Sequence, residues 1–288
     1  MRILFVHGHG RKVLEDFKRI EDEILDLAKR LGLEIGIVYT PRSLNEVDAI
    51  NDLKPFGFAF ADNGAYQFLT GSWEHSLILR KDRVERWFNT FAEFLERLDY
   101  DEYALPDLPV HGKEFAPREE RLNRIAESAR LHAGFLDRYG LPNWVPVLQG
   151  YEIDEYELSY QLLKDFGIES NFYAVGSVCS RKKTKTLIPF VQQFLDSCCE
   201  QVRRFHFFGL NFRAAKPFRR HPRLYSIDTG AWAHALRWRW RDIAKSLGYS
   251  DEEIKRMKYN RAEKLKAVLK HILLSFSDTH SKLTSSPC

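Results

Sequence analysis

Short apolar runs alternate with longer amphipathic stretches along the chain, and this alternation predicts an α/β fold, a (β/α)8 barrel of the TIM type. Eight runs are rich in β-branched and aromatic residues, and most of them are continuously apolar rather than alternating. Continuous apolar runs are typical of strands that are buried on both faces of a parallel sheet. A doubly wound open sheet is the structural alternative.

The eight predicted strands cover residues 2–7, 34–40, 57–62, 101–106, 144–149, 171–176, 203–209 and 223–228. Helical periodicity is clear between most of them, as in residues 11–31, where Phe17, Ile20 and Ile24 share one face. The further predicted helices cover residues 83–98, 118–136, 154–166 and 186–202. Helical patterns are weakest after the second and seventh strands.

After the eighth strand, residues 231–247 and 251–276 are predicted to form two final helices. No linker or repeat divides the chain, so residues 1–276 are predicted to form a single domain. The polar segment 277–288 is predicted to be a flexible tail.

Composition excludes several classes of protein. The chain has 288 residues, of which 44% are hydrophobic, and no run approaches the ~18 apolar residues of a membrane-spanning helix. Four cysteines occur without a CxxC pair, which argues against a disulfide scaffold or a thiolate zinc site. The first residues lack a signal-peptide pattern. We therefore expect a cytoplasmic protein with no membrane partner.

Polar or very small residues follow six of the predicted strands. A (β/α)8 barrel brings the carboxyl ends of its strands together at one mouth, where active sites lie. The residues at these ends are Asp62, Asp107, Gln149 with Gly150, Gly176 with Ser177, Asn211 and Asp228. Each Asp or Asn is equally compatible with a turn or a helix cap, but three carboxylates at one topological position favour a reaction site.

When carboxylates lie close together, their like charges push their pKa values apart. One carboxylate can then stay ionised and serve as a nucleophile, while another holds a proton and serves as an acid/base. A glutamine amide and a backbone N–H could recognise a flat heterocycle by its donors and acceptors. Tyr66, Phe68 and Tyr173 could supply a stacking face, although ordinary core packing is the alternative and is favoured for Phe68.

Six stretches carry a resemblance to a known family. In order, they are 61-ADNGAYQF-68, 105-LPDLP-109, 146-PVLQG-150, 173-YAVGSVCSR-181, 206-HFFGL-210 and 226-SIDTGAW-232. The chain resembles the tRNA-guanine transglycosylase superfamily over roughly residues 55 to 240. It looks closest to the DpdA-type proteins, which insert 7-deazaguanine bases into DNA.

The resemblance implies a role for each matching residue. Asp228 would be the nucleophile, and Asp62 would be the general acid/base, presented by the turn Asn63-Gly64. Asp107 would contact the amine-bearing edge of the base, while Gln149 and the N–H of Gly176 would hold its carbonyl oxygen.

Four further residues are assigned to the substrate pocket. Tyr66 would line or cover the base, and Gly150, Ser177 and His206 are placed beside it. Because His206 lies within an apolar strand, a core histidine is an equally good interpretation.

The implied function is exchange of guanine for a 7-deazaguanine base such as preQ0 in DNA, through a covalent aspartyl intermediate and without a cofactor. The family's C-x-C-x-x-C…His zinc site has no counterpart after Asp228, so we expect no zinc subdomain and no metal. Action on tRNA and a non-catalytic nucleic-acid-binding role are the alternatives. A homodimer or accessory modification proteins are the expected protein partners.

Basic segments in the second half suggest contact with a polyanion. Their phosphate-binding candidates are Arg181, Lys182, Arg219, Arg220, Arg237 and Arg239. Trp238 or Trp240 could stack on an unpaired base. The alternative for residues 234–245 is an amphipathic helix with its tryptophans in the core.

Two further readings remain open. Cys179 could be a thiol nucleophile, but spacing indicates no histidine partner for it. His7 and His9, with Asp228, could serve a metal-dependent hydrolase, although we interpret residues 7–10 mainly as a strand-to-helix turn at the mouth.

Overall fold

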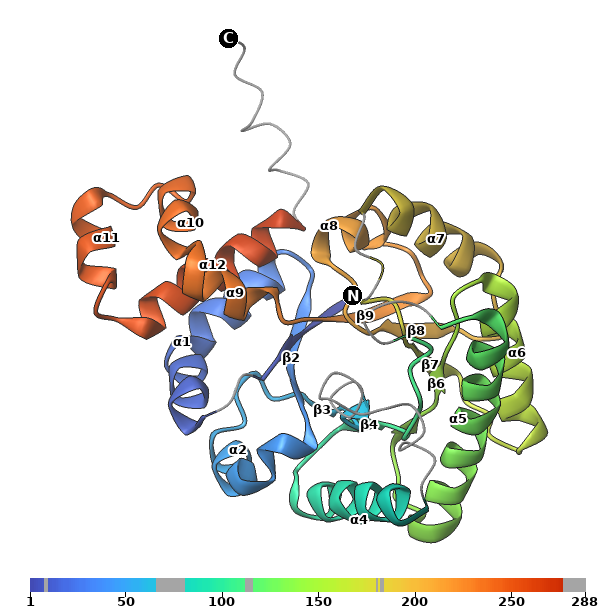
Figure 1. The fold of residues 1–288 in the computed structure, drawn as a ribbon. Helices are drawn as coiled ribbons and strands as arrows, with labels where there is room; N and C mark the ends of the chain where they lie inside the picture. The colour runs from blue at the N-terminus through green and yellow to red at the C-terminus, as the bar shows by residue number, and fades with distance from the viewer. Residues whose placement is uncertain (8–9, 66–80, 112–115, 180, 182–183, 277–288) are drawn as a thin grey trace.

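Nine parallel strands form a nearly closed barrel that helices surround (Figure 1). The computed structural model describes residues 1–7, 10–65, 81–111, 116–179, 181 and 184–276. The strands are β1 Arg2–Val6, β2 Glu34–Tyr39, β3 Ala59–Ala61, β4 Glu102–Ala104, β5 Trp144–Val145, β6 Val147–Leu148, β7 Phe172–Val175, β8 Arg204–Phe207 and β9 Leu224–Thr229. Their order in the sheet is β5-β4-β3-β2-β1-β9-β8-β7-β6. The predicted barrel is therefore confirmed, and the open-sheet alternative is wrong.

The two ends of this strand order are halves of one predicted strand, residues 144–149, which Pro146 divides. On one side, the N–H of Leu105 donates to the carbonyl of Val145 at 2.9 Å. On the other side, the N–H of Ala174 donates to the carbonyl of Pro146, also at 2.9 Å. Proline has no N–H, so the hydrogen-bond ladder is interrupted there. The barrel is still closed, because β5 and β6 are consecutive parts of one chain segment that Pro146 joins.

Helices cover the outside of the barrel. They are α1 Arg11–Arg30, η1 Pro41–Glu46, α2 Val47–Leu53, α4 Lys81–Arg97, α5 Arg118–Tyr139, α6 Ile153–Asp165, α7 Thr184–Ser197, α8 Phe212–Ala215, η3 Lys216–Phe218, α9 Ala231–Trp238, α10 Trp240–Ser246, α11 Asp251–Met257 and α12 Arg261–Ser275. The connections after β2 and β8, where the helical pattern is weakest, carry only short helices. Helices α9 to α12 gather beside α1, and α12 packs against it (Figure 1).

The two predicted C-terminal helices are each broken in two, which corrects the sequence prediction. Arg239 leaves the helical conformation at φ −126° and ψ 0°, and it separates α9 from α10. Asn260 adopts an extended conformation, and its side chain accepts a hydrogen bond from the N–H of Glu263 at 3.2 Å. That side-chain cap starts α12 as a new helix.

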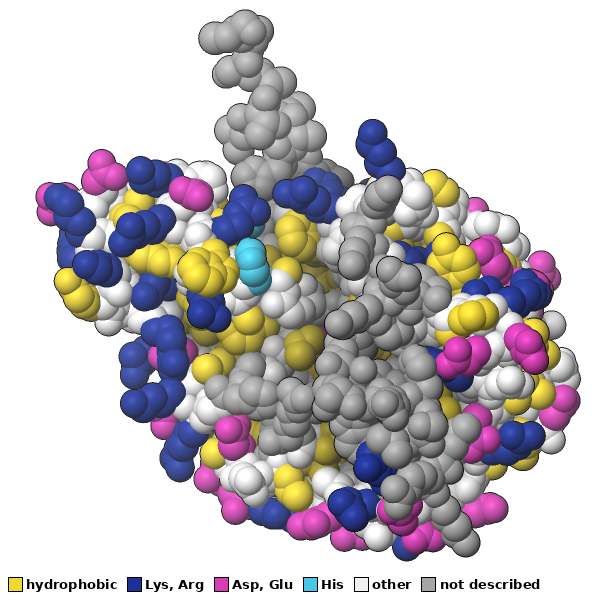
Figure 2. Space-filling view, in the orientation of Figure 1, with side chains coloured by type: hydrophobic (Ala, Val, Ile, Leu, Met, Phe, Trp, Pro, Cys, Tyr) yellow, Lys and Arg dark blue, Asp and Glu magenta, His cyan; other side chains and the backbone are white. Residues whose placement is uncertain are grey.

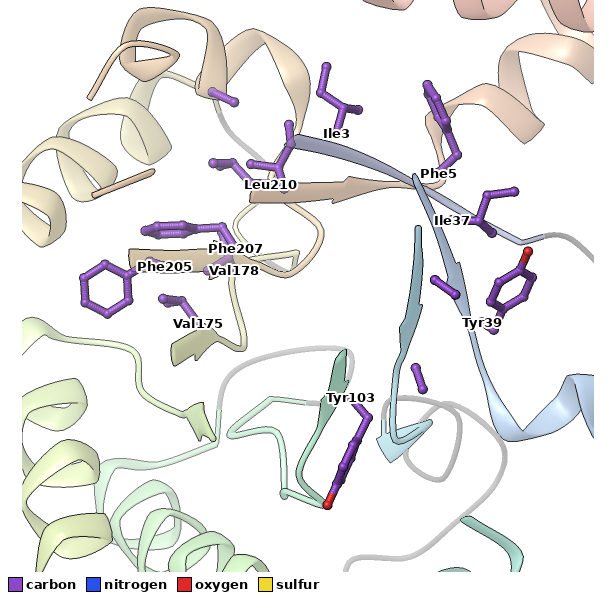
Figure 3. Close-up of a cluster of buried hydrophobic side chains, with 14 of the residues drawn as sticks. Ile3, Phe5, Ile37, Tyr39, Tyr103, Val175, Val178, Phe205, Phe207 and Leu210 are labelled. Atoms are coloured by element: carbon purple, nitrogen blue, oxygen red, sulfur yellow. The ribbon is translucent and has the colours of Figure 1, made fainter. Parts of the chain in front are cut away.

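The core has two layers, because side chains alternate inward and outward along each strand. Leu4, Val38, Phe60, Ala104 and Ala174 belong to the cluster inside the barrel. Outward-facing residues such as Phe5, Ile37 and Phe207 fill the larger cluster between the strands and the helices, part of which is shown in Figure 3.

The helices of the described residues include none whose length and apolar character would let it cross a bilayer.

Gly36 is a test of the close packing between neighbouring strands. A Cβ at this position would lie 2.7 Å from the ring of Phe58 and 2.9 Å from its backbone oxygen. Because backbone atoms cannot move aside cheaply, we expect Gly36→Ala to lower the free energy of unfolding by about 1–3 kcal/mol in denaturant titrations. Gly134→Ala is the matched control, since its Cβ would meet only one atom, at 4.0 Å, and alanine favours a helix. Equal unfolding midpoints for the two variants would contradict the expected crowding.

Candidate active site

A cavity of about 310 Å³ opens at the carboxyl ends of the strands. Seven residues predicted from the sequence line it together: Asp62, Asn63, Asp107, Gln149, Gly176, Ser177 and Asp228. They come from five strands or the segments that directly follow them. A volume of this size is at the lower end of the ~300–1,000 Å³ range of small-molecule sites.

Asp62 directly follows β3 and faces the other two carboxylates. Its pKa is raised to about 7, first by burial and then by the charges of Asp107 and Asp228. The N–H groups of Asn63 and Gly64 donate to the Asp62 carboxylate and oppose this rise in pKa. Gly64 has φ +76°, a conformation that glycine adopts without strain. A tight turn at Asn63-Gly64 therefore presents Asp62, as the sequence predicts.

Asp107 is buried and accepts two side-chain hydrogen bonds. The Nδ2 of Asn63 donates to its Oδ1 at 2.6 Å, and the Nε2 of Gln149 donates to its Oδ2. Burial raises the pKa of Asp107 to about 6, while these two amide donors oppose the rise. Asn63 is itself fixed. Its Nδ2 also donates to the carbonyl of Leu105, and its backbone carbonyl accepts from the indole N–H of Trp87. The network orients the carboxylate toward the cavity residues.

Asp228, on β9, is held by the backbone of the neighbouring strand connection. The N–H of Gly209 donates to its Oδ1 at 2.6 Å, and the Nε2 of His206 lies 3.5 Å from the same oxygen. The Nδ1 of His206 contacts the hydroxyl of Ser226 at 2.9 Å. Both contacts restrict the Asp228 carboxylate to one position at the cavity wall.

His206 is fully buried beneath the cavity and does not line it. Its ring stacks on Phe60 at a centroid distance of 5.1 Å and meets Phe208 edge-on at 4.6 Å. The prediction of direct substrate contact is corrected accordingly. Among the cavity carboxylates, His206 contacts Asp228, whose Oδ1 lies 3.5 Å from the Nε2 of His206.

The glycines of the site make room rather than contacts, which corrects their predicted role. The N–H of Gly176 donates to the carbonyl of Leu148 at 2.8 Å, so the barrel ladder already uses the donor assigned to the base. A Cβ on Gly176 would lie 2.1 Å from the Nε2 of Gln149, and one on Gly150 would lie 2.8 Å from the ring of Tyr156. Both positions require glycine because other side chains approach closely.

The structure adds one residue that the sequence prediction missed, His111. Its Nε2 lies 3.6 Å from the Sγ of Cys179, so the inference that Cys179 has no histidine partner is wrong. The Oγ of Ser177 donates its only hydrogen to the Oε1 of Gln149, and therefore the Nδ1–H of His111 must donate to Ser177, at 3.0 Å. That tautomer leaves a lone pair on Nε2 facing the thiol.

Burial lowers the pKa of His111 to about 4, and the charges of Arg124 and Arg181 act in the same direction. The imidazole is therefore neutral at pH 7, and its lowered pKa makes it a weaker base than an ordinary histidine. His111 follows Asp107 by four residues in the segment after β4, and this position was the only local signal for it.

The proposed stacking aromatics are not confirmed. Tyr173 points outward from β7, where its hydroxyl donates to the carbonyl of Ile168 at 3.3 Å and accepts from the N–H of Ser170 at 3.2 Å. Its predicted stacking role is wrong, because the alternation along the strand turns it away from the cavity. Tyr66 and Phe68 lie outside the described residues.

The described members of the predicted phosphate-binding set lie outside the cavity. The guanidinium of Arg181 packs over the ring of Phe190 at 3.7 Å and donates to the carbonyl of Tyr151, so it is engaged within the fold. Arg219 is half-buried and Arg220 is exposed, and Lys182 is outside the described residues.

The tryptophans of the same basic region differ in their surroundings. Arg237 packs over Trp238, which is 65% exposed. Trp240 instead packs against the core beneath the C-terminal helices, as the amphipathic alternative expects. Arg239 lines a second cavity, described below.

Within the described ranges, no three His, Cys, Asp or Glu side chains are grouped so that they could hold a metal ion. His7 follows β1, and its Nε2 contacts the carboxylate of Glu46 at 3.1 Å. The N–H of Gly10, directly before α1, donates to the same carboxylate. His9 lies outside the described residues.

No protein-family model matches the chain, and neither does any curated protein. Among solved structures, one match is fructose-bisphosphate aldolase from Plasmodium falciparum, in a ternary complex with TRAP and a small-molecule inhibitor. The two chains are 10% identical over 95% of this chain and 89% of that one, with a TM-score of 0.46. A likeness this distant transfers no property of the aldolase.

Replacing Asp62 tests its raised pKa through protein stability. The folded protein binds a proton at Asp62 more tightly than the unfolded chain, whose aspartate pKa is near 3.8. Stability is therefore lost as pH rises from about 4 to about 7. We expect Asp62→Asn to be more stable than wild type at pH 8, by about 1–3 kcal/mol, and equal to it near pH 4.

Urea titrations at both pH values measure this difference. Asp137→Asn, on the exposed face of α5, is the matched control and should shift stability by less than ~0.5 kcal/mol at either pH. A pH-independent difference for Asp62→Asn would contradict the raised pKa.

Proposed function

We propose that this barrel is a base-exchange transglycosylase that replaces guanine in a polynucleotide with a 7-deazaguanine base such as preQ0. DNA is the preferred polymer and tRNA is the second candidate. The observation that supports this most strongly is the convergence of Asp62, Asp107 and Asp228 with Gln149 around one base-sized cavity. The six sequence motifs of the family resemblance lie in the same order along the barrel.

In the first half of the reaction, a carboxylate oxygen of Asp228 attacks C1′ of a target nucleotide that is flipped into the cavity. The bond between C1′ and the guanine nitrogen breaks, and its electron pair stays on the base. Asp62, with its pKa near 7, donates a proton to that nitrogen. The products are neutral guanine and a glycosyl ester of Asp228.

The second half reverses these steps with a new base. Asp62, now a carboxylate, removes a proton from the ring nitrogen of the incoming 7-deazaguanine, and this nitrogen attacks C1′. The ester bond breaks, and Asp228 returns to its carboxylate form. One proton is given and taken back, so the exchange balances without a redox cofactor.

Recognition of the base is assigned to Asp107 and Gln149. The Asp107 carboxylate can accept hydrogen bonds from the amine-bearing edge of a guanine-like base, and its two amide partners hold it in place. The Gln149 amide has a second N–H that can donate to the carbonyl oxygen of the base. Because the N–H of Gly176 is used by the ladder, this contact falls to Gln149 alone.

A second candidate function follows from the contact between His111 and Cys179. The Nε2 of His111 faces the thiol and can accept its proton, so a group transfer through Cys179 would use the same cavity with a different nucleophile. The lowered pKa of His111 makes it a weak base, which ranks this candidate below the Asp228 mechanism. A non-catalytic nucleic-acid-binding role is the remaining alternative. In each case we expect action in the cytoplasm, with a second copy or accessory modification proteins as partners.

Covalent trapping separates these candidates. Protein is incubated with guanine-containing DNA or tRNA, with and without preQ0, and run on denaturing gels. We expect a DNA-dependent shifted band in wild type, its loss in Asp228→Asn and its retention in Cys179→Ser, because the ester forms on the Asp228 carboxylate. A band with tRNA alone would select the second polymer.

The reverse pattern, with the band lost only in Cys179→Ser, would support the thiol mechanism instead. No band with either polymer, from folded wild-type protein with preQ0 present, would favour the binding role. Near-identical circular dichroism spectra of the three proteins control for folding.

The pH dependence of exchange tests the role of Asp62. Guanine departure needs the protonated acid and base capture needs the carboxylate, so kcat should peak near pH 7 and fall on both sides. We expect Asp62→Asn to lower kcat at least ~100-fold. Asp107→Asn should mainly raise KM for the base while the decline above pH 7 persists. Retention of the wild-type pH profile in Asp62→Asn would assign the proton transfer to another group.

A further inference from the structure

A second cavity, of about 950 Å³, lies between the short helices after β8 and the C-terminal helices. Residues of α8, η3, α9, α10 and α12 form its walls. We name it the basic groove after the side chains that line it: Arg213, Lys216, His234, Arg239 and His271. In Figure 2, dark-blue Lys and Arg side chains surround a histidine over the C-terminal helices.

The basic groove has an unbalanced charge. Among the described residues, its lining contains no Asp or Glu, and Arg213, Lys216 and Arg239 form no ion pair with a carboxylate. Some other cations of the C-terminal helices are paired: Arg261 contacts Asp16, and Lys266 contacts Glu23 at 3.1 Å. The groove cations therefore present their charge to solvent, as a site for an anion requires.

The basic groove lies close to the candidate active site along the chain. Gly209 and Asp228 are hydrogen-bonded to each other at the catalytic cavity. Phe212 and Ala231, three residues later in each segment, line the groove. Three residues span at most ~11 Å. Successive phosphates of one strand are spaced by about 3.4 Å along a helix axis, so phosphates a few nucleotides from a flipped base can reach this distance.

The floor of the basic groove is apolar, with Ile243, Leu247 and Ile272 among its residues. A cationic rim above an apolar floor suits a nucleic-acid strand, whose phosphates are charged and whose sugars and base faces are not. A small inorganic anion would leave most of this volume empty.

We propose that the basic groove binds the phosphodiester backbone beside the flipped target nucleotide, and that Arg213, Lys216 and Arg239 contact its phosphates. This rests on the proposed action on a polynucleotide. The cation set differs from the one expected from the sequence, of which Arg239 alone lines the groove.

The test uses a fluorescein-labelled oligothymidylate, which contains no guanine and so binds without base exchange. Its affinity is measured by anisotropy at several salt concentrations, for the full chain and for a triple variant, Arg213→Ala/Lys216→Ala/Arg239→Ala. The matched control is Lys255→Ala/Arg256→Ala/Lys258→Ala. It removes the same charge from exposed positions at α11, outside the groove.

We expect the groove variant to bind at least ~10-fold more weakly, with a salt dependence lower by about 2 in log–log slope, since each phosphate contact on a single strand contributes about 0.7. The control should bind within about 2-fold of wild type. Equal losses in both variants, or no loss in the groove variant, would overturn the proposal. Failure of wild type to bind oligothymidylate at low salt would overturn it as well.

The outcome is separable from that of the proposed function. Loss of oligothymidylate binding in the groove variant, together with no Asp228 adduct in wild type, would leave the groove assignment standing and remove only the base exchange.

Discussion

The alternation of side chains along parallel strands is the constraint on which the whole site depends. On β3 and its extension, Phe60 points into the barrel, and Asp62, two residues later, shares its face. Ser226 and Asp228 repeat this relation on β9. Because the strands pair side by side around the whole barrel, a shift of one residue in the register of a strand would turn its carboxylate outward and an apolar side chain into the cavity. The inner core and the reactive groups are thus specified by the same register.

Three carboxylates in one cavity remain distinct because each receives different hydrogen bonds. Asp107 accepts from two side-chain amides, Asp228 accepts from the backbone of Gly209, and Asp62 accepts from the N–H groups of its own turn. Burial and mutual repulsion raise the pKa of Asp62, whereas amide donors limit the rise at Asp107. In the proposed reaction, similar side chains thereby take different roles, with Asp62 moving a proton and Asp107 holding the base.

Much of this arrangement could be predicted from the sequence, because an apolar run followed by a polar residue marks a strand end locally. Asp62, Asp107, Gln149 and Asp228 were found in this way. Some of the errors concern contacts between distant segments. The ladder bond from Gly176 to Leu148 and the approach of His111 to Cys179 join residues of different strand segments, which only the folded barrel brings together. The helix breaks at Arg239 and Asn260 were missed because the apolar periodicity continues through the flanking segments, and of the two residues only Asn260 carries a side-chain cap.

The seam at Pro146 has a consequence for the behaviour of the protein at high concentration. A sheet edge exposes unpaired backbone groups that can template pairing with another molecule. In the described barrel every strand has neighbours on both sides except at this seam, where β5 and β6 each pair on one side. A proline there cannot donate to an added strand. Residues 145 to 148 are also buried within the ring, so this interruption of the ladder does not act as an exposed edge for intermolecular strand addition.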